Sequence, residues 1–442
     1  MILNNLKDIH FYLTLFFIYF AFFNISYFSI FCLLLFLFAD FDKLMKYKEI
    51  FFLTTIVFYS LRFLFSLSSR FDNMWEFISL NNYSSVERFW DLQLNLISMK
   101  CIFGNVDNYY LKFSSTSYKS CPYSAQYGPL STKVPYIGDI WVGTIIFSFF
   151  AISSLLLIYY RVYKSRPTDI FLLTFIFMAP SMNFLIERMN IDIFILIFSL
   201  ISLYYYEKYP QFTTIFLLIL SLYKIHPIGI LFGLLFYSHV QKNKKNFNLI
   251  FNSIIVFFVC YILDAIFITN SVLDTEWRPA GLDITFGILS DSIILNNLIS
   301  VQTYLIYVVL LIVPILFTFF TDIGSSLFNY SIEKEDLKYF FAFSSLFLVN
   351  ILYANYDYRI PLFLPLVIIL SKHIRGKFQY IFMFLMPLSI PLLESMDFLN
   401  DLVMYIGRLS FYFFYFIILR YYKNYLFNSI DFSYLQSSES NI

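Results

Sequence analysis

Long apolar runs recur along almost the whole chain and constrain its fold more than any other feature. A helix needs roughly 20 predominantly apolar residues to cross the hydrocarbon of a bilayer. With 60% of its 442 residues hydrophobic and 13% charged, the chain is predicted to be an all-α integral membrane protein. The expected spans lie near residues 49–67, 137–160, 169–186, 193–206, 212–223, 228–239, 247–269, 298–320, 338–354, 360–371, 378–396 and 402–421.

One further apolar run, near residues 9–38, opens the chain. It is either one long tilted helix or a pair broken near Asn24, so we expect 13 or 14 transmembrane or half-membrane helices. The run is too long for a signal peptide and has no small-residue cleavage site after it. We therefore expect a single membrane-embedded domain over residues 1–442, ending in a flexible cytoplasmic tail at residues 431–442.

Clusters of basic residues in short connections predict the orientation of the chain. When the spans are counted alternately, four clusters fall on one side: Lys43, Lys46 and Lys48; Arg161, Lys164 and Arg166; Lys242, Lys244 and Lys245; Lys372, Arg375 and Lys377. Short basic loops face the cytoplasm. The other connections are then extracytoplasmic: a large first loop over residues 68–136, "ERMNID" (187–192), "KIHP" (224–227), residues 270–297 and "NYDYR" (355–359).

Ionisable residues gather in these outer turns, where an uncompensated charge beside hydrocarbon is costly and marks a functional candidate. We expect a ring of cations that binds a phosphate, formed by Arg188, Lys224, His226, Arg278 and Arg359, with Glu187, Asn190, Asp192 and Asp357 supporting it. The alternative is that these are charges at helix ends that pair with one another and reach toward the membrane surface.

The large outer loop contains a second candidate. Residues 85–105 carry an apolar helical stripe of Val86, Phe89, Leu92, Leu96, Met99 and Phe103, ended by Gly104, which predicts a helix along the membrane surface. Glu87 and Asp91 are four residues apart and share one face. A carboxylate at such a boundary can act as a general base. The alternative is an amphipathic helix whose acidic face is solvated.

Three other residues of this loop are of interest. Cys101 and Cys121 either form a disulfide, if the loop is outside the reducing compartment, or are two lone thiols. Tyr127 lies in the Pro- and Gly-containing stretch "SCPYSAQYGPLSTKVPYIGDIW" (120–141), which is either a lid or a connector.

Six short motifs carry a resemblance to a known family: "FWDLQ", "CIFGNVDNYY", "YGPLS", "ERMNID", "KIHPIGILFGLLF" and "NYDYR". Together they resemble the family-87 membrane glycosyltransferases of the GT-C class. Family members tend to have a tyrosine and two prolines where this chain has Tyr127, Gly128 and Pro129. They tend to have Arg-Gly-Asn where it has Arg188, Met189 and Asn190.

The resemblance implies a GT-C-like fold and a catalytic acidic residue in the first outer loop, which is Asp91 here, with Glu87 as second candidate. It implies inverting, metal-independent transfer of a monosaccharide, mannose or another hexose, from a polyprenyl-phosphate donor to a glycolipid or glycan acceptor. The reaction would take place outside a bacterial cytoplasmic (inner) membrane.

The residues themselves are compatible with that expectation. The sequence has no glycine-rich phosphate loop and no carboxylate cluster with metal-ligand spacing, so we expect no cofactor and no metal. A net charge of +1 argues against a nucleic-acid partner, and membrane lipid is the expected surrounding. The alternatives are an O-antigen or polysaccharide polymerase, a flippase or transporter of lipid-linked sugars, and a structural membrane protein.

Overall fold

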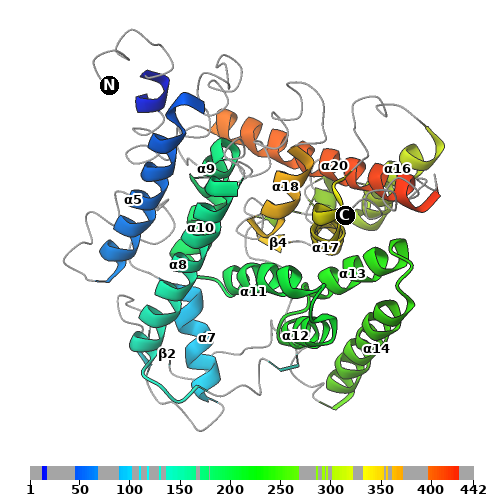
Figure 1. Cartoon of the computed structure of the whole chain (residues 1–442), viewed down its shortest axis with the longest axis horizontal. Helices are drawn as coiled ribbons and strands as arrows, with labels where there is room; N and C mark the ends of the chain where they lie inside the picture. Colours follow the sequence, from blue (N-terminus) through cyan, green and yellow to red (C-terminus); the bar gives the residue numbers. More distant parts are fainter. Residues whose placement is uncertain are drawn as a thin grey trace, which may run out of the picture.

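The structure is almost entirely helical (Figure 1). It is a computed structural model that describes residues 12–16, 45–67, 89–101, 109–110, 117–118, 129–130, 136–165, 170–178, 180–267, 285–286, 291–293, 295–296, 301–321, 332–352, 355–356, 361–371 and 397–427. Two antiparallel pairs of two-residue strands accompany the helices: β1 (Tyr109–Tyr110) with β2 (Ser117–Tyr118), and β3 (Thr285–Phe286) with β4 (Asn355–Tyr356).

Most helices coincide with the predicted apolar runs where the structure describes those runs. In chain order they are α5 (Lys48–Ser66), α7 (Trp90–Cys101), α8 (Ile140–Ser165), α9 (Ile170–Met178), α10 (Pro180–Arg188), α11 (Asp192–Tyr205), α12 (Pro210–Tyr223), α13 (Ile228–Val240), α14 (Lys244–Phe267), α16 (Thr303–Phe320), α17 (Lys334–Ile351), α18 (Leu364–Ser371) and α20 (Asp397–Phe427), and a short 3-10 turn, η1 (Met45–Tyr47), precedes α5. The expected span at 378–396, most of the run at 9–38 and the tail at 431–442 lie outside the described residues.

Within the described residues, four helices are long and apolar enough to cross a membrane: Lys48–Ser66, Ile140–Lys164, Lys244–Asp264 and Thr303–Phe320. These helices indicate a membrane protein. Shorter apolar helices include α11 and α12, each of 14 residues. At 1.5 Å per residue each is about 21 Å long, which is less than the roughly 30 Å of a hydrocarbon core.

The single span predicted at 169–186 is wrong, because the structure divides it into α9 and α10. Proline lacks a backbone N–H and clashes with the preceding turn, so Pro180 starts a new helix, where its fixed φ is favourable. Side chains bind two carbonyls at the end of α9. The Tyr59 hydroxyl donates to the carbonyl of Phe177 at 2.5 Å, and the Asn183 amide donates to that of Met178 at 2.9 Å.

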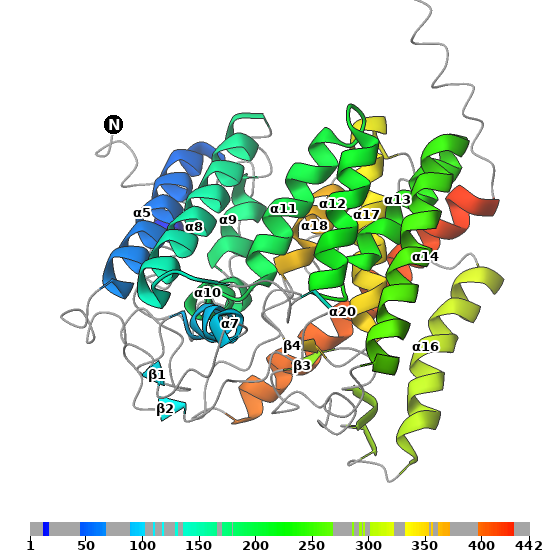
Figure 2. The same ribbon diagram turned by 90° about the horizontal axis from the view of Figure 1, so that it is seen from below.

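The helices form one bundle in which α5, α8, α11, α12, α13 and α14 stand side by side, while α7 lies at its lower end, against α8 and α10 (Figure 2). The start of α5, the end of α8 and the α13–α14 turn lie together at the upper end in this view. These connections carry three of the four predicted basic clusters, and the fourth, at residues 372–377, lies outside the described residues. The α10–α11 and α12–α13 turns lie at the other end, beside α7.

Two glycines let α13 approach α17 closely. A Cβ atom at Gly233 would lie 2.1 Å from the carbonyl oxygen of Phe341, and one at Gly229 would lie 2.6 Å from Cα of Leu346. The spacing is the Gly-x-x-x-Gly pattern that brings membrane helices together. Buried aromatic residues of α17 and α20 extend this contact. The pair α13–α17 thus holds the start of α13, and with it the "KIHP" turn, in a fixed position.

Candidate functional site

The "ERMNID" stretch is a tight helix-ending turn rather than a loose connection. The N–H of Asn190 donates to the carbonyl of Leu185, and the N–H of Met189 donates to that of Ile186. This is the paired hydrogen-bond pattern that closes a helix through one left-handed residue. That residue is Met189, with φ of 46°. Glycine usually fills such a position, because it has no Cβ atom.

The turn projects Arg188 and Asn190 onto the carboxylate of Asp91, which is in the first turn of α7 and is 9% exposed. Arg188 donates from Nε and Nη2 to Asp91 Oδ1, at 3.0 and 2.6 Å. The Asn190 amide donates to Oδ2 at 2.6 Å. Hydrogen bonds between ionised groups are about twice as strong as neutral ones. Both oxygens of Asp91 are therefore oriented by the α10–α11 turn.

The backbone joins the same two elements. Phe89 immediately precedes α7, has φ of 55° and a buried side chain, and donates its N–H to the carbonyl of Glu187 at 2.8 Å. Left-handed backbone is strained for a bulky residue and persists only where its surroundings enforce it. Two such residues, Phe89 and Met189, flank the contact between Asp91 and Arg188. Strain concentrated in this way is a frequent property of functional sites.

A second, fully buried cluster extends from Asn190. The side-chain oxygen of Asn190, Oδ1, accepts from Lys224 Nζ at 3.3 Å and from the N–H of Asp192 at 3.1 Å. Lys224 Nζ is also 2.7 Å from Asp192 Oδ1, and His226 Nε2 is 3.0 Å from the same oxygen. Lys224 follows α12 and His226 precedes α13, so the "KIHP" turn supplies an ammonium group and an imidazole.

Six of the predicted site residues therefore form one network: Asp91, Arg188, Asn190, Asp192, Lys224 and His226. The structure places them as a chain of paired charges, because Asp91 faces Arg188, and Asp192 faces Lys224 and His226. The cations that the structure describes do not form an open ring. Arg188 is the most accessible of them, with 32% of its side chain exposed, whereas Lys224 and His226 are buried.

The alternative of a solvated acidic face on α7 is wrong for the residues that the structure describes. Besides Asp91, the polar side chains of Gln93 and Asn95 are buried. The apolar stripe is buried at Leu92 and Leu96, and the helix packs against α8 and α10. Asp91 is thus largely shielded from water, while 32% of the side chain of its partner Arg188 is exposed.

Glu187 has a partner that the sequence reasoning missed. Arg62, near the end of α5, is buried and donates from Nη2 to Glu187 Oε1 at 2.6 Å and from Nη1 to Asn183 Oδ1 at 3.2 Å. Its guanidinium also lies over the ring of Phe58. An arginine within an otherwise apolar span is itself a signal of a buried contact. The pair ties α5 to the helix that carries Arg188.

Another buried pair was also missed. Arg408, on α20, donates to Asp291 Oδ1, and the Tyr412 hydroxyl donates to Oδ2 at 2.7 Å. Its signal was the same, because Arg408 lies within the apolar run at 402–421. No contact between this pair and the Asp91 network is found among the described residues.

Several predicted residues lie outside the described part of the chain: Glu87, Tyr127, Arg278, Asp357, Arg359 and Cys121. Cys101 ends α7, but its side chain is not described, so the disulfide stays a prediction. Within the described residues, no group of three His, Cys, Asp or Glu side chains could hold a metal ion.

The geometry permits specific chemistry at Asp91. A carboxylate has about four lone-pair positions, and the described hydrogen bonds use three of them. One position is left for a hydroxyl group, beside the partly exposed guanidinium of Arg188. No protein family, curated protein or solved structure matches this chain.

Proposed function

We propose that the protein is a GT-C-like, polytopic membrane glycosyltransferase of the cytoplasmic membrane. It transfers a hexose such as mannose from polyprenyl phosphate to a glycolipid or glycan acceptor on the extracytoplasmic face. The observation that carries the proposal is the oriented carboxylate of Asp91, joined to Arg188 and Asn190 at the end of the bundle opposite the basic connections. A lipid-linked donor would present its phosphate at that level of the membrane.

In the proposed reaction the acceptor hydroxyl gives its proton to Asp91 as its oxygen bonds to the anomeric carbon. The bond from that carbon to the phosphate oxygen breaks on the opposite side, and polyprenyl phosphate leaves with the electron pair. The configuration is inverted. Asp91 is thus the catalytic base, a role that commonly contributes about 10²- to 10⁴-fold in rate.

Arg188 binds the donor phosphate in this scheme. Its guanidinium is accessible, and a phosphate offers it the same paired acceptors as a carboxylate. When Arg188 moves from Asp91 to the phosphate, Asp91 Oδ1 loses two donors and becomes available to the acceptor hydroxyl. Donor binding would therefore activate the base.

Lys224, His226 and Asp192 are positioning residues, because they act on Asp91 through Asn190. The side-chain Oδ1 of Asn190 accepts hydrogen bonds from Lys224 and from the backbone N–H of Asp192. These bonds fix the NH₂ group of Asn190 toward Asp91. Arg62 and Glu187 similarly hold the end of α10. Arg278 and Arg359 remain candidates for further phosphate contacts.

The test supplies purified protein in lipid nanodiscs with polyprenyl phosphate carrying radiolabelled mannose or glucose, together with a membrane glycolipid extract as acceptor. Release of polyprenyl phosphate, with label on the acceptor, is the expected result. Intact donor moved between leaflets would instead indicate a flippase. Reaction only with pyrophosphate-linked oligosaccharides would indicate a polymerase. Either outcome, or no release in folded protein, would overturn the proposal.

A further inference from the structure

A cavity of about 910 Å³ lies at the other end of the bundle from the Asp91 network. Its wall includes Tyr204 near the end of α11, Tyr237 in the last turn of α13 and Lys334 at the start of α17. Twelve residues of α11 separate Asp192 from Tyr204, which is about 18 Å along a helix. The cavity is therefore a separate site, at the bundle end that carries the basic connections (Figure 2). Its volume is within the range of pockets that bind small molecules.

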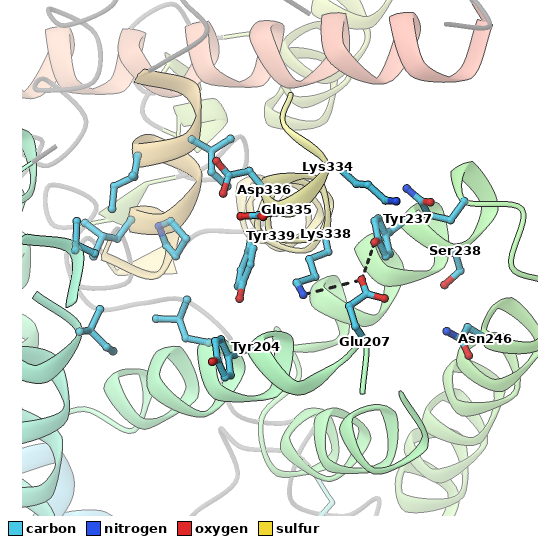
Figure 3. Close-up of a pocket in the computed structure, with 18 of the residues that line it drawn as sticks. Tyr204, Glu207, Tyr237, Ser238, Asn246, Lys334, Glu335, Asp336, Lys338 and Tyr339 are labelled. Atoms are coloured by element: carbon cyan, nitrogen blue, oxygen red, sulfur yellow. Dashed lines mark hydrogen bonds and ion pairs between the residues drawn. The ribbon is translucent and has the colours of Figure 1, made fainter. Parts of the chain in front are cut away.

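The cavity has one apolar side and one polar side. Leu200, Leu364 and Ile368, from α11 and α18, belong to the apolar side. The polar side comes from α13, α14, α17 and the turn after α11, and Figure 3 shows Lys338 and Tyr237 directed toward the carboxylate of Glu207. A ligand that fits both sides must itself be amphipathic.

Lys338 is the residue that points to an anionic group. Its side chain is only 12% exposed, and its nearest carboxylate oxygen, on Glu207, is 4.0 Å away. Among the described residues no acceptor lies within hydrogen-bond distance of its ammonium group. An ammonium carries three donors, and the 4.0 Å ion pair with Glu207 leaves them without a hydrogen-bond acceptor in the described part of the chain. A bound phosphate oxygen would satisfy it.

The carboxylates of the cavity point to a cationic group in the same ligand. Glu207 is 58% exposed, accepts from the Tyr237 hydroxyl at 2.7 Å, and so turns its carboxylate toward the cavity opening. Glu335 and Asp336 add two further acids, against the two cations Lys334 and Lys338. The surplus of acid disfavours a ligand with net negative charge. Carboxylates hydrogen-bond to a primary ammonium but not to a quaternary one.

We propose that this cavity binds a zwitterionic phospholipid with a primary ammonium group, namely phosphatidylethanolamine. Its phosphate lies against Lys338, its ammonium against Glu207, and an acyl chain along the apolar side. The site is independent of the proposed transferase activity. It would anchor α13, whose other end follows the turn with His226, against α17 at the membrane surface.

Native mass spectrometry of the purified full chain in detergent tests the proposal. Phosphatidylethanolamine, phosphatidylcholine and phosphatidylglycerol with identical acyl chains are added separately. We expect one molecule of phosphatidylethanolamine to be retained with at least fivefold preference over the other two. Equal retention of all three lipids, or of none, would overturn the assignment. Soluble glycerophosphoethanolamine that binds as tightly as the lipid would show that the apolar side has no role, and would overturn it as well.

Variants locate the site. Lys338→Gln should reduce retention of phosphatidylethanolamine about tenfold, because it removes a charge-assisted hydrogen bond to phosphate. Glu207→Gln should remove the preference over phosphatidylcholine. Lys245→Gln, an exposed lysine of α14 that does not line the cavity, is the matched control and should bind as the wild type does. If Lys338→Gln fails to fold, Glu207→Gln decides, and unchanged selectivity in that variant would refute the proposal.

Discussion

Replacement of Asp91 by asparagine separates a catalytic role from a structural one. The variant keeps the shape of the side chain but removes the negative charge and one acceptor. With the new amide oxygen toward Arg188, its NH₂ group would face the Asn190 amide, whose nitrogen is 2.6 Å from Asp91 Oδ2 in the wild type. Asn190 cannot turn over without losing its contacts to Lys224 and to the N–H of Asp192. One buried donor is left unsatisfied, at a cost of about 1–3 kcal/mol.

The same change should lower the rate of hexose transfer by about 10²- to 10⁴-fold, as expected when a general base is lost. The assay is release of polyprenyl phosphate per mole of folded protein, with the folded fraction taken from thermal unfolding in detergent. Turnover within threefold of the wild type in the folded fraction would refute the role of Asp91, whatever happens to stability.

Asp291→Asn is the matched control for this experiment. Its carboxylate is also buried, and it also accepts from an arginine and from a second side chain, here the hydroxyl of Tyr412. We expect a comparable loss of stability with turnover retained in the folded fraction. A loss of transfer equal to that of Asp91→Asn would mean that the assay reports folding alone.

Three further changes test the packing around the site. Lys224→Met leaves the buried carboxylate of Asp192 without the Lys224 ammonium and should cost about 3–5 kcal/mol in unfolding free energy. Adding Asp192→Leu should restore stability but not hexose transfer. Normal transfer in this double variant would contradict the positioning role. Gly233→Ala places a Cβ atom against the backbone of α17 and should cost about 1–3 kcal/mol, so unchanged thermal unfolding would rule out the close approach. Met189→Gly should destabilise the protein less than Met182→Gly does, by about 2–3 kcal/mol in unfolding free energy. Both variants lose a buried side chain, but glycine relieves the left-handed backbone at residue 189 and weakens the helix at residue 182. Equal losses of stability would contradict the strained turn.

The sequence alone determined where most of the described helices lie. Hydropathy is a local property, because each residue of a membrane helix must be apolar or have its polar groups hydrogen-bonded by neighbouring residues. The apolar runs at 193–206 and 212–223 therefore correspond closely to α11 and α12. Local chemistry also placed ionisable residues at the turns, where the helices end. The break at Pro180 is also encoded locally, by a proline within the run at 169–186.

Only the tertiary structure decided which charges pair. Asp91 and Arg188 are 97 residues apart, and their contact depends on α7 lying across the bundle against α10, which no periodicity in either segment encodes. The same holds for Arg62, which meets Glu187 across 125 residues. Coulombic attraction does not select a partner among many ionisable groups until helix packing has removed water and fixed their distances. Packing therefore turned the predicted open ring of cations, as far as the structure describes it, into a network of ion pairs.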